Sequence, residues 1–249
     1  MKKNALTLNI DALCADPCIR SLDAELQIFA KEHANKDILS EGEVSLLGVE
    51  SFSIREPLFD QYVCPSLPEA LADLQERPQA HECLQKVWKR PFRGKTFAID
   101  VEALASSLLG QTMRIRDFDV AAQDRVSKQI TARYPSAKQV QAGIPILENL
   151  ISKKCCDLPF LSAFIAMIYF YRLHPLPDGN GRTSRAIINI CLRNYGLITK
   201  PTFLISPILI RYLPQIEPMI RKGEGVAWQL FARLLKIAIM AHSLNHNSP

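Results

Sequence analysis

Twelve consecutive residues, 174–185, hold the residue types that phosphate chemistry needs. They read His-Pro-Leu-Pro-Asp-Gly-Asn-Gly-Arg-Thr-Ser-Arg. His174 has a side chain that titrates near neutrality, as a general base for a hydroxyl should. Asp178 carries a carboxylate, which is the kind of ligand that a hard cation such as Mg²⁺ prefers. A base and a cation ligand this close together indicate chemistry at a phosphate.

The glycines of the same stretch predict a phosphate-binding turn. Gly179-Asn180-Gly181 can bend the backbone so that successive N–H groups point inward as an anion-binding nest. Apolar residues at helical spacing follow over 182–194, so the turn opens a helix whose free amides and positive dipole end favour phosphate. Arg182 and Arg185 are neighbours on that helix and can grip phosphate oxygens. The alternative is a glycine-rich turn that only caps a helix.

These twelve residues resemble the signature of the Fic family, HPFx(D/E)GNGRxxR. Leu176 is the one departure, because the family usually has Phe there, and either side chain can anchor the loop by apolar burial. The resemblance extends over about 100–240 and is faint over the first hundred residues. It implies a mainly α fold, a Fic-type helical bundle with a short β-hairpin flap.

The resemblance also implies an activity, namely transfer of AMP from ATP to a Ser, Thr or Tyr hydroxyl of a target protein. His174 would be the catalytic base and Asp178 would hold Mg²⁺ on the phosphates. The nucleotide would be bound by the nest amides with the Asn180 side chain and by the two arginines, that is by Gly179, Asn180, Gly181, Arg182 and Arg185. ATP and Mg²⁺ are therefore the expected substrate and cofactor. Three alternatives stay open: transfer of another nucleotide, removal of AMP, and a nucleotide-binding interaction module without catalysis.

A short strand or hairpin arm is predicted over 130–136, where β-branched and aromatic residues precede a proline. In the Fic family this segment is a flap that aligns the target by main-chain pairing. Arg133 and Tyr134 would then belong to a target-docking flap, which would place Tyr134 near the site, and Tyr212 would line the adenine pocket. The alternative is that both tyrosines are simply packed. The partner is a hydroxyl-bearing protein; self-modification and a homodimer are further options.

Many Fic proteins carry an inhibitory helix, (S/T)xxxE(G/N), whose glutamate pairs with the second motif arginine. Residues 37–42 keep the Glu-Gly pair but begin with Asp. Glu41 would pair with Arg185 and compete with the γ-phosphate of ATP. Glu25 is a competitor for this role, and the remaining option is that both carboxylates are solvated.

The resemblance implies a Fic domain over 99–242, preceded by an N-terminal helical region over 1–98 that would carry the inhibitory helix and followed by a disordered tail over 243–249. A helix over 99–109 should begin with Asp100 as its N-cap and end at Gly110. Other helices are expected over 21–33, 65–74, 81–88, 144–151, 158–172, 182–195, 205–212, 216–221 and 226–242. The segment 38–52 is short and mixed in pattern.

Composition permits one good core in a chain of 249 residues, 48% apolar, with a formal net charge of +5. The basic run 86–95 is interpreted as a solvated linker, and nucleic acid is not an expected partner. Cys14 and Cys18, in a disordered-looking start, and the adjacent Cys155 and Cys156 are expected to be ordinary reduced thiols, because no zinc pattern surrounds them. No stretch is apolar enough for a membrane span, so a cytoplasmic protein is expected, with secretion as an effector left open.

Overall fold

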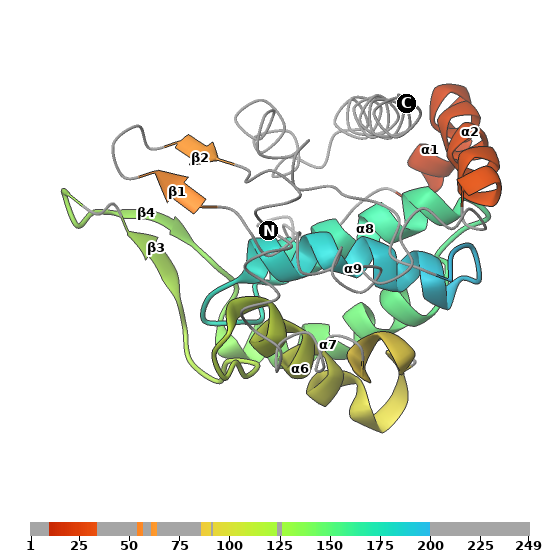
Figure 1. Cartoon of the computed structure of the whole chain (residues 1–249). Coiled ribbons are helices and arrows are strands. Elements are labelled where there is room, and N and C mark those ends of the chain that lie inside the picture. The colour runs from red at the N-terminus through yellow and green to blue at the C-terminus, as the bar shows by residue number, and fades with distance from the viewer. Residues whose placement is uncertain are drawn as a thin grey trace, which may run out of the picture.

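The computed structural model describes residues 10–33, 54–56, 61–63, 86–90, 92–123 and 126–199. It contains α1 (Ile10–Ala15), α2 (Pro17–His33), β1 (Ile54–Glu56), β2 (Gln61–Val63), the 3₁₀ turn η1 (Gly94–Thr96), α6 (Phe97–Leu109), β3 (Ala121–Gln123), β4 (Ile130–Arg133), α7 (Ala137–Ser152), α8 (Pro159–Leu173) and α9 (Asn180–Asn194). The described part is mainly helical with two small antiparallel hairpins, which confirms the predicted fold class (Figure 1). Within these ranges no helix is both long and apolar enough to cross a bilayer.

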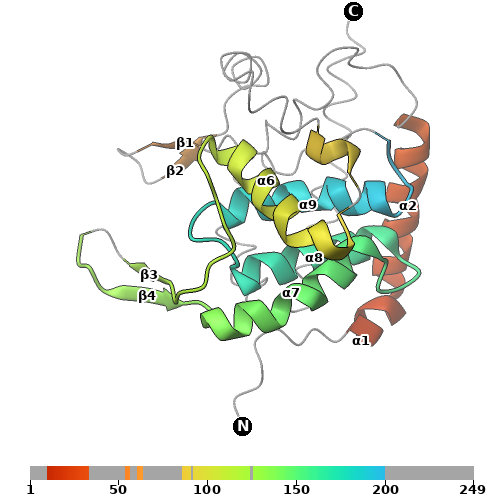
Figure 2. The same ribbon diagram turned by 90° about the horizontal axis from the view of Figure 1, so that it is seen from below.

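Helix α8 is the centre of the core. Its residues from Pro159 to Phe170 are all buried, because apolar side chains occupy every face of the helix. Helices α2, α7 and α9 pack around it (Figures 1 and 2). The approach of α7 depends on Gly143, where an added Cβ would lie 2.4 Å from Leu173 Cδ1. Helix α8, which ends at the twelve-residue motif, is therefore fixed in place by contacts with α2, α7 and α9.

The N-terminal helices also pack on this core, through a buried carboxylate. Asp23 of α2 accepts hydrogen bonds from the Leu161 amide at 2.8 Å and from Gln27 Nε2 at 2.9 Å. Since the N-cap residue of α8, Leu158, offers no side-chain acceptor, Asp23 caps that helix from a distant part of the chain. The disordered-looking start around Cys14 and Cys18 is in fact helical, because apolar residues of α1 and α2 pack on the core, and the helix predicted over 21–33 is present within α2.

Two predicted helix ends differ from the structure. Gly110 does end α6, in the left-handed conformation at φ 68°, but Thr96 and not Asp100 is the N-cap. Asp100 is instead buried in the first turn, where it accepts the Thr96 hydroxyl at 3.0 Å. Helix α7 begins seven residues before the predicted residue 144, because Ser136 and Gln139 form a capping box.

The basic run 86–95 is not a solvated linker. Val87, Trp88 and Phe92 are buried in the core. Trp88 Nε1 donates to the Thr199 carbonyl at 3.1 Å, and the Arg193 guanidinium lies 4.9 Å from the centre of the indole ring. Trp88 therefore packs against the end of α9 and Phe92 meets Phe97 of α6 edge-on, which charge counting along the sequence does not reveal.

The predicted strand at 130–136 is present as β4. It pairs with β3 in an antiparallel hairpin in which Ala121 faces Arg133 and Ala122 faces Ala132. The hairpin extends away from the helices (Figure 1). Because this sheet has only two strands, each strand keeps one edge outside the pair.

Candidate functional site

The motif loop connects α8 to α9 and is fixed by its own side chains. Leu176 is fully buried, as its apolar character predicted. The buried Asn180 side chain accepts the Leu176 amide at 2.9 Å and donates to the Leu176 carbonyl at 2.8 Å. Each polar atom of Asn180 thus makes one hydrogen bond that fixes the loop, which leaves the second Nδ2 hydrogen for another partner. Contact between this side chain and phosphate stays a prediction.

The glycine turn forms the start of α9. Gly179 is the N-cap at φ 73°, and no side chain caps the helix. A Cβ on Gly179 would lie 2.4 Å from Leu109 Cδ1, so the turn needs glycine for both its conformation and its space. At Gly181 a Cβ would come within 3.4 Å of Arg185 Nη1. First-turn amides without intrahelical partners and an adjacent guanidinium suit an anion such as phosphate.

Asp178 lies beside this turn and is largely exposed. Its Oδ1 accepts the Gly179 amide at 2.6 Å, and its Oδ2 lies 3.7 Å from Arg182 Nη2. Among the described residues no group of three or more His, Cys, Asp or Glu side chains could hold a metal. A cation here would need further oxygens from a bound phosphate, which is how Mg²⁺ commonly binds. The donor set therefore fits Mg²⁺ that arrives with a nucleotide.

His174 is the C-cap of α8 and adopts a left-handed conformation at φ 50°. Burial lowers the pKa of its imidazole to about 4, and the charge of Arg116 acts in the same direction, while the Tyr171 backbone and Asp178 oppose the shift. The ring is therefore neutral at physiological pH and can accept a proton. The Tyr134 ring lies parallel to it, with centroids 3.5 Å apart at 9°. Tyr134, which directly follows β4, therefore lies against the imidazole.

Arg116 is the residue that sequence reasoning missed. It is 1% exposed and donates from Nε to the His174 carbonyl at 2.7 Å and from Nη1 to the Phe118 carbonyl at 2.8 Å. Its Nη2 donates to the Pro135 carbonyl, and its own amide donates to the Pro175 carbonyl at 2.9 Å. One guanidinium thus joins the motif loop to both ends of the β3–β4 hairpin. The sequence does not reveal this role of Arg116, because its three side-chain partners are backbone carbonyls, which every residue has.

The remaining predicted residues are distributed as follows. Arg133 is exposed at the end of β4. Glu25 lies on α2 two residues from Asp23, near the start of α8, whereas the motif follows the end of that helix, roughly 20 Å away at 1.5 Å per residue. Glu25 is therefore badly placed to reach Arg185. Glu41 and Tyr212 lie outside the described residues.

Comparison with known proteins agrees with this geometry. The Fic/DOC family model matches residues 99–192. The fold is similar to that of a Fic family protein from Desulfovibrio desulfuricans, with TM-score 0.51 and 16% identity over 96% of this chain and 70% of that one. It is also similar to a glutamate-to-glycine variant of Fic-1 from C. elegans, with TM-score 0.56 and 15% identity over 92% of this chain and 73% of that one. No curated protein sequence matches the chain. The chain thus has a segment similar to the Fic/DOC family, which runs from α6 through the motif to α9, within a fold similar to that of Fic proteins.

Proposed function

We propose that the protein is an adenylyltransferase that transfers AMP from ATP to a hydroxyl side chain of a protein. Similarity to the Fic family supports nucleotidyl transfer in general. The observation that carries the finer proposal is the pairing of a neutral, half-buried His174 with an uncapped, glycine-led helix start five residues later. A binding module needs the second feature alone, whereas a transferase needs both.

In the proposed reaction the target hydroxyl oxygen attacks the α-phosphorus of ATP and His174 takes the hydroxyl proton. The bond from the α-phosphorus to the bridging oxygen breaks, so pyrophosphate leaves and the target carries AMP. The amides of Asn180 and Gly181 would face the charge that grows on the α-phosphate oxygens. Arg182 and Arg185 hold the outer phosphates. Mg²⁺ held by Asp178 would supply charge neutralisation on the leaving pyrophosphate.

The target would dock by adding a strand to the β3–β4 hairpin. Docking of this kind uses main-chain hydrogen bonds and demands little of the target's side chains. Tyr134 directly follows β4 and stacks on His174, so the strand at which the target would dock ends beside the catalytic base. A docked segment would thus present its hydroxyl near the imidazole. Glu41 remains the proposed inhibitor, acting by competition for Arg185.

Incubation with Mg²⁺ and ATP labelled at the α-phosphate tests this proposal. Wild type, Glu41→Gly and His174→Ala are compared for covalent label on the protein itself and on lysate proteins, with His33→Ala at the end of α2 as the matched histidine control. We expect label in wild type and His33→Ala, more label in Glu41→Gly, and a loss of on the order of a hundredfold or more in His174→Ala.

Nucleotide binding measured on the same four proteins separates the alternatives. Retained ATP binding in His174→Ala with no label supports catalysis by the base. Binding without label in every variant, Glu41→Gly included, would replace the transferase by an interaction module. Parallel reactions with labelled GTP, UTP and CTP identify which nucleotide is transferred, because the residues that contact phosphate do not distinguish one nucleobase from another. Release of AMP from a previously labelled target would identify the reverse activity.

A further inference from the structure

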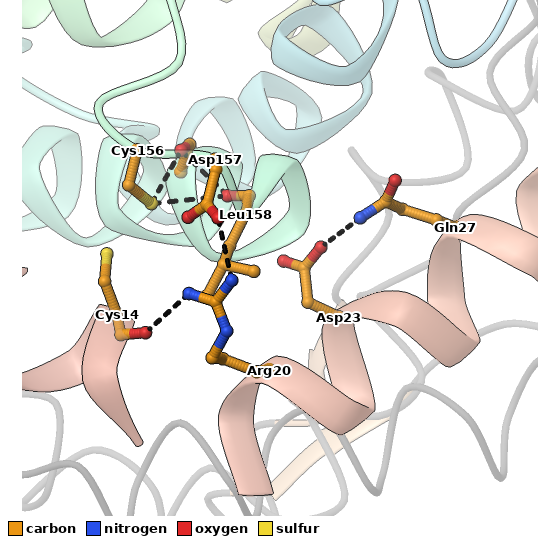
Figure 3. A network of polar contacts seen from close by, with 8 residues as sticks. Cys14, Arg20, Asp23, Gln27, Cys156, Asp157 and Leu158 are labelled. Carbon is orange, nitrogen blue, oxygen red and sulfur yellow. Dashed lines mark hydrogen bonds and ion pairs between the residues drawn. The ribbon is translucent and has the colours of Figure 1, made fainter. Parts of the chain in front are cut away.

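Three cysteines from two distant segments gather where the N-terminal helices meet the core. Cys14 lies at the end of α1, while Cys155 and Cys156 lie in the loop before α8. All three thiols are half-buried and pack against the hydrophobic core. Figure 3 shows the Cys14 sulfur pointing toward Cys156 across the junction. None of them has a role in the proposed transfer reaction, because the motif follows the opposite end of α8.

Polar contacts hold the two segments together at this point. Arg20 of α2 donates to the Cys14 carbonyl at 3.1 Å and to Asp157 Oδ2 at 2.8 Å, so one guanidinium spans the junction (Figure 3). Asp157 directly follows Cys156. Asp23, one turn further along α2, caps α8 through Leu161. These two bridges fix Cys14 beside Cys156 independently of the thiols themselves.

The surroundings of Cys156 favour a reactive thiol. Its Sγ lies 3.4 Å from Ser162 Oγ, and Cys155 Sγ lies 3.5 Å from the same hydroxyl. The Ser162 hydroxyl donates to the Leu158 carbonyl at 2.9 Å, so Ser162 can act as an acceptor for the neighbouring thiols. The hydrogen bond from Cys155 is the largest cause that lowers the pKa of Cys156, and burial opposes it. The positive start of α8 and the charge of Arg20 act in the same direction. Cys156 therefore has the thiolate character from which oxidation begins.

We propose that Cys156 and Cys14 form a peroxide-sensitive thiol pair that closes into a disulfide between α1 and the loop before α8. In the first step the Cys156 thiolate attacks a hydroperoxide, the O–O bond breaks, and Cys156 becomes a sulfenic acid while the alkoxide or hydroxide takes up a proton. In the second step Cys14 sulfur attacks the Cys156 sulfur, and the hydroxyl leaves as water with the Cys14 proton. The two thiols lose two electrons, which reduce the hydroperoxide.

The roles of the two sulfurs follow from their environments. Burial is the largest cause that raises the pKa of Cys14, to about 12, and the hydrogen bond and charge of Cys156 add to it. Cys14 thus stays protonated while Cys156 carries the charge. Once Cys156 is a neutral sulfenic acid, those two contributions disappear and Cys14 becomes easier to ionise. The resolving step is thereby delayed until the first step has occurred.

The pair is tested on the purified full chain, treated with hydrogen peroxide in the absence of nucleotide. Free thiols are then alkylated, and peptides are mapped without reduction. Wild type is compared with Cys14→Ser, Cys155→Ser and Cys156→Ser, with Cys18→Ser as the control at an exposed cysteine of α2. Reduced variants are first compared by circular dichroism and melting temperature, so that misfolded ones are recognised.

We expect a peptide that links Cys14 to Cys156 in wild type, Cys155→Ser and Cys18→Ser. Cys14→Ser should accumulate a sulfenic acid at Cys156 that a dimedone probe traps, and Cys156→Ser should lose both products. The closed loop from residue 14 to 156 should raise the melting temperature by roughly 5 °C or more over the reduced protein. Oxidation of Cys18 at the same rate as Cys156, or a dominant link between Cys155 and Cys156 or to Cys64 or Cys83, would overturn the proposal. The linked peptide in wild type is sufficient to show the disulfide, so the proposal can be decided even if one variant misfolds.

Discussion

Replacement of Arg116 by methionine should separate the β3–β4 hairpin from the motif loop. The substitution keeps the buried aliphatic stem and removes three hydrogen bonds to carbonyls, those of His174, Phe118 and Pro135. Each bond from a charged donor contributes about 1.5–3 kcal/mol. Phe118 is half exposed, so part of the loss is recovered by water at the hairpin base. Two remaining bonds at the lower end of that range give an expected loss of about 3 kcal/mol in the free energy of unfolding.

This loss corresponds to a fall in melting temperature of roughly 6–12 °C at roughly 2–4 °C per kcal/mol for a chain of this size. AMP transfer should fall by at least about tenfold, and by as much as about a hundredfold, because displacement of a base by even 1 Å carries such a cost. Arg116→Lys keeps the charge but cannot reach three carbonyls together, so its activity should lie between those of wild type and the methionine variant.

Arg114→Met is the matched control, because Arg114 is exposed two residues earlier in the same segment. Its unfolding free energy should change by no more than about 0.5 kcal/mol. The assays are thermal unfolding followed by circular dichroism and the labelled-ATP reaction. If Arg116→Met melted within about 2 °C of wild type and transferred AMP at the same rate, the argument that this guanidinium couples the hairpin to the base would be refuted.

Three further predictions concern the base, the capping carboxylate and the turn. The pKa of His174 should be near 4 when its imidazole is titrated by NMR, with His174→Ala used to assign the signal. Because this folded-state pKa lies below the ordinary 6.5, the stability that the neutral ring contributes is present above pH 6.5 and is lost as the pH falls toward 4. A titration at 6.5 would contradict burial as the cause. Burial raises the pKa of Asp23 to about 6, so its stabilising effect is lost as pH rises from about 4 to 6, and the stability of Asp23→Asn relative to wild type should grow over that interval in urea titrations. Gly179→Ala should destabilise more than Gly196→Ala by about 1–2 kcal/mol, because both positions have positive φ but only Gly179 also meets Leu109; equal losses would mean that the Leu109 side chain moves aside freely.

The parts of the site that sequence predicts are those whose partners lie close in the chain. Gly179 and Leu176 have their roles fixed within a few residues by turn geometry and burial, so the motif loop could be derived before the fold was known. The same holds for Gly110 at the end of α6. Local steric rules act on each of these residues without help from the rest of the chain.

The features that sequence could not predict depend on partners far along the chain. Arg116 finds its carbonyls 2, 19 and 58 residues away, and Asp23 caps a helix 138 residues later. Trp88 looks like part of a basic linker until its contact with the residue 111 positions later is seen. Sequence reasoning places such residues on the surface, because the partners that stabilise them in the interior come close only when the chain folds.

The capping of α8 by Asp23 also has a consequence for folding during synthesis, because α2 is synthesised before α8. Helix α2 leaves the ribosome 138 residues before the amide that it will bond. Helix α8 emerges later, apolar on every face and without a capping side chain of its own. A pre-formed α2 would meet it at once and shield one side, whereas a chain without α2 would expose that surface to other nascent chains. The N-terminal helices can thus act as a covering segment for this apolar helix during synthesis.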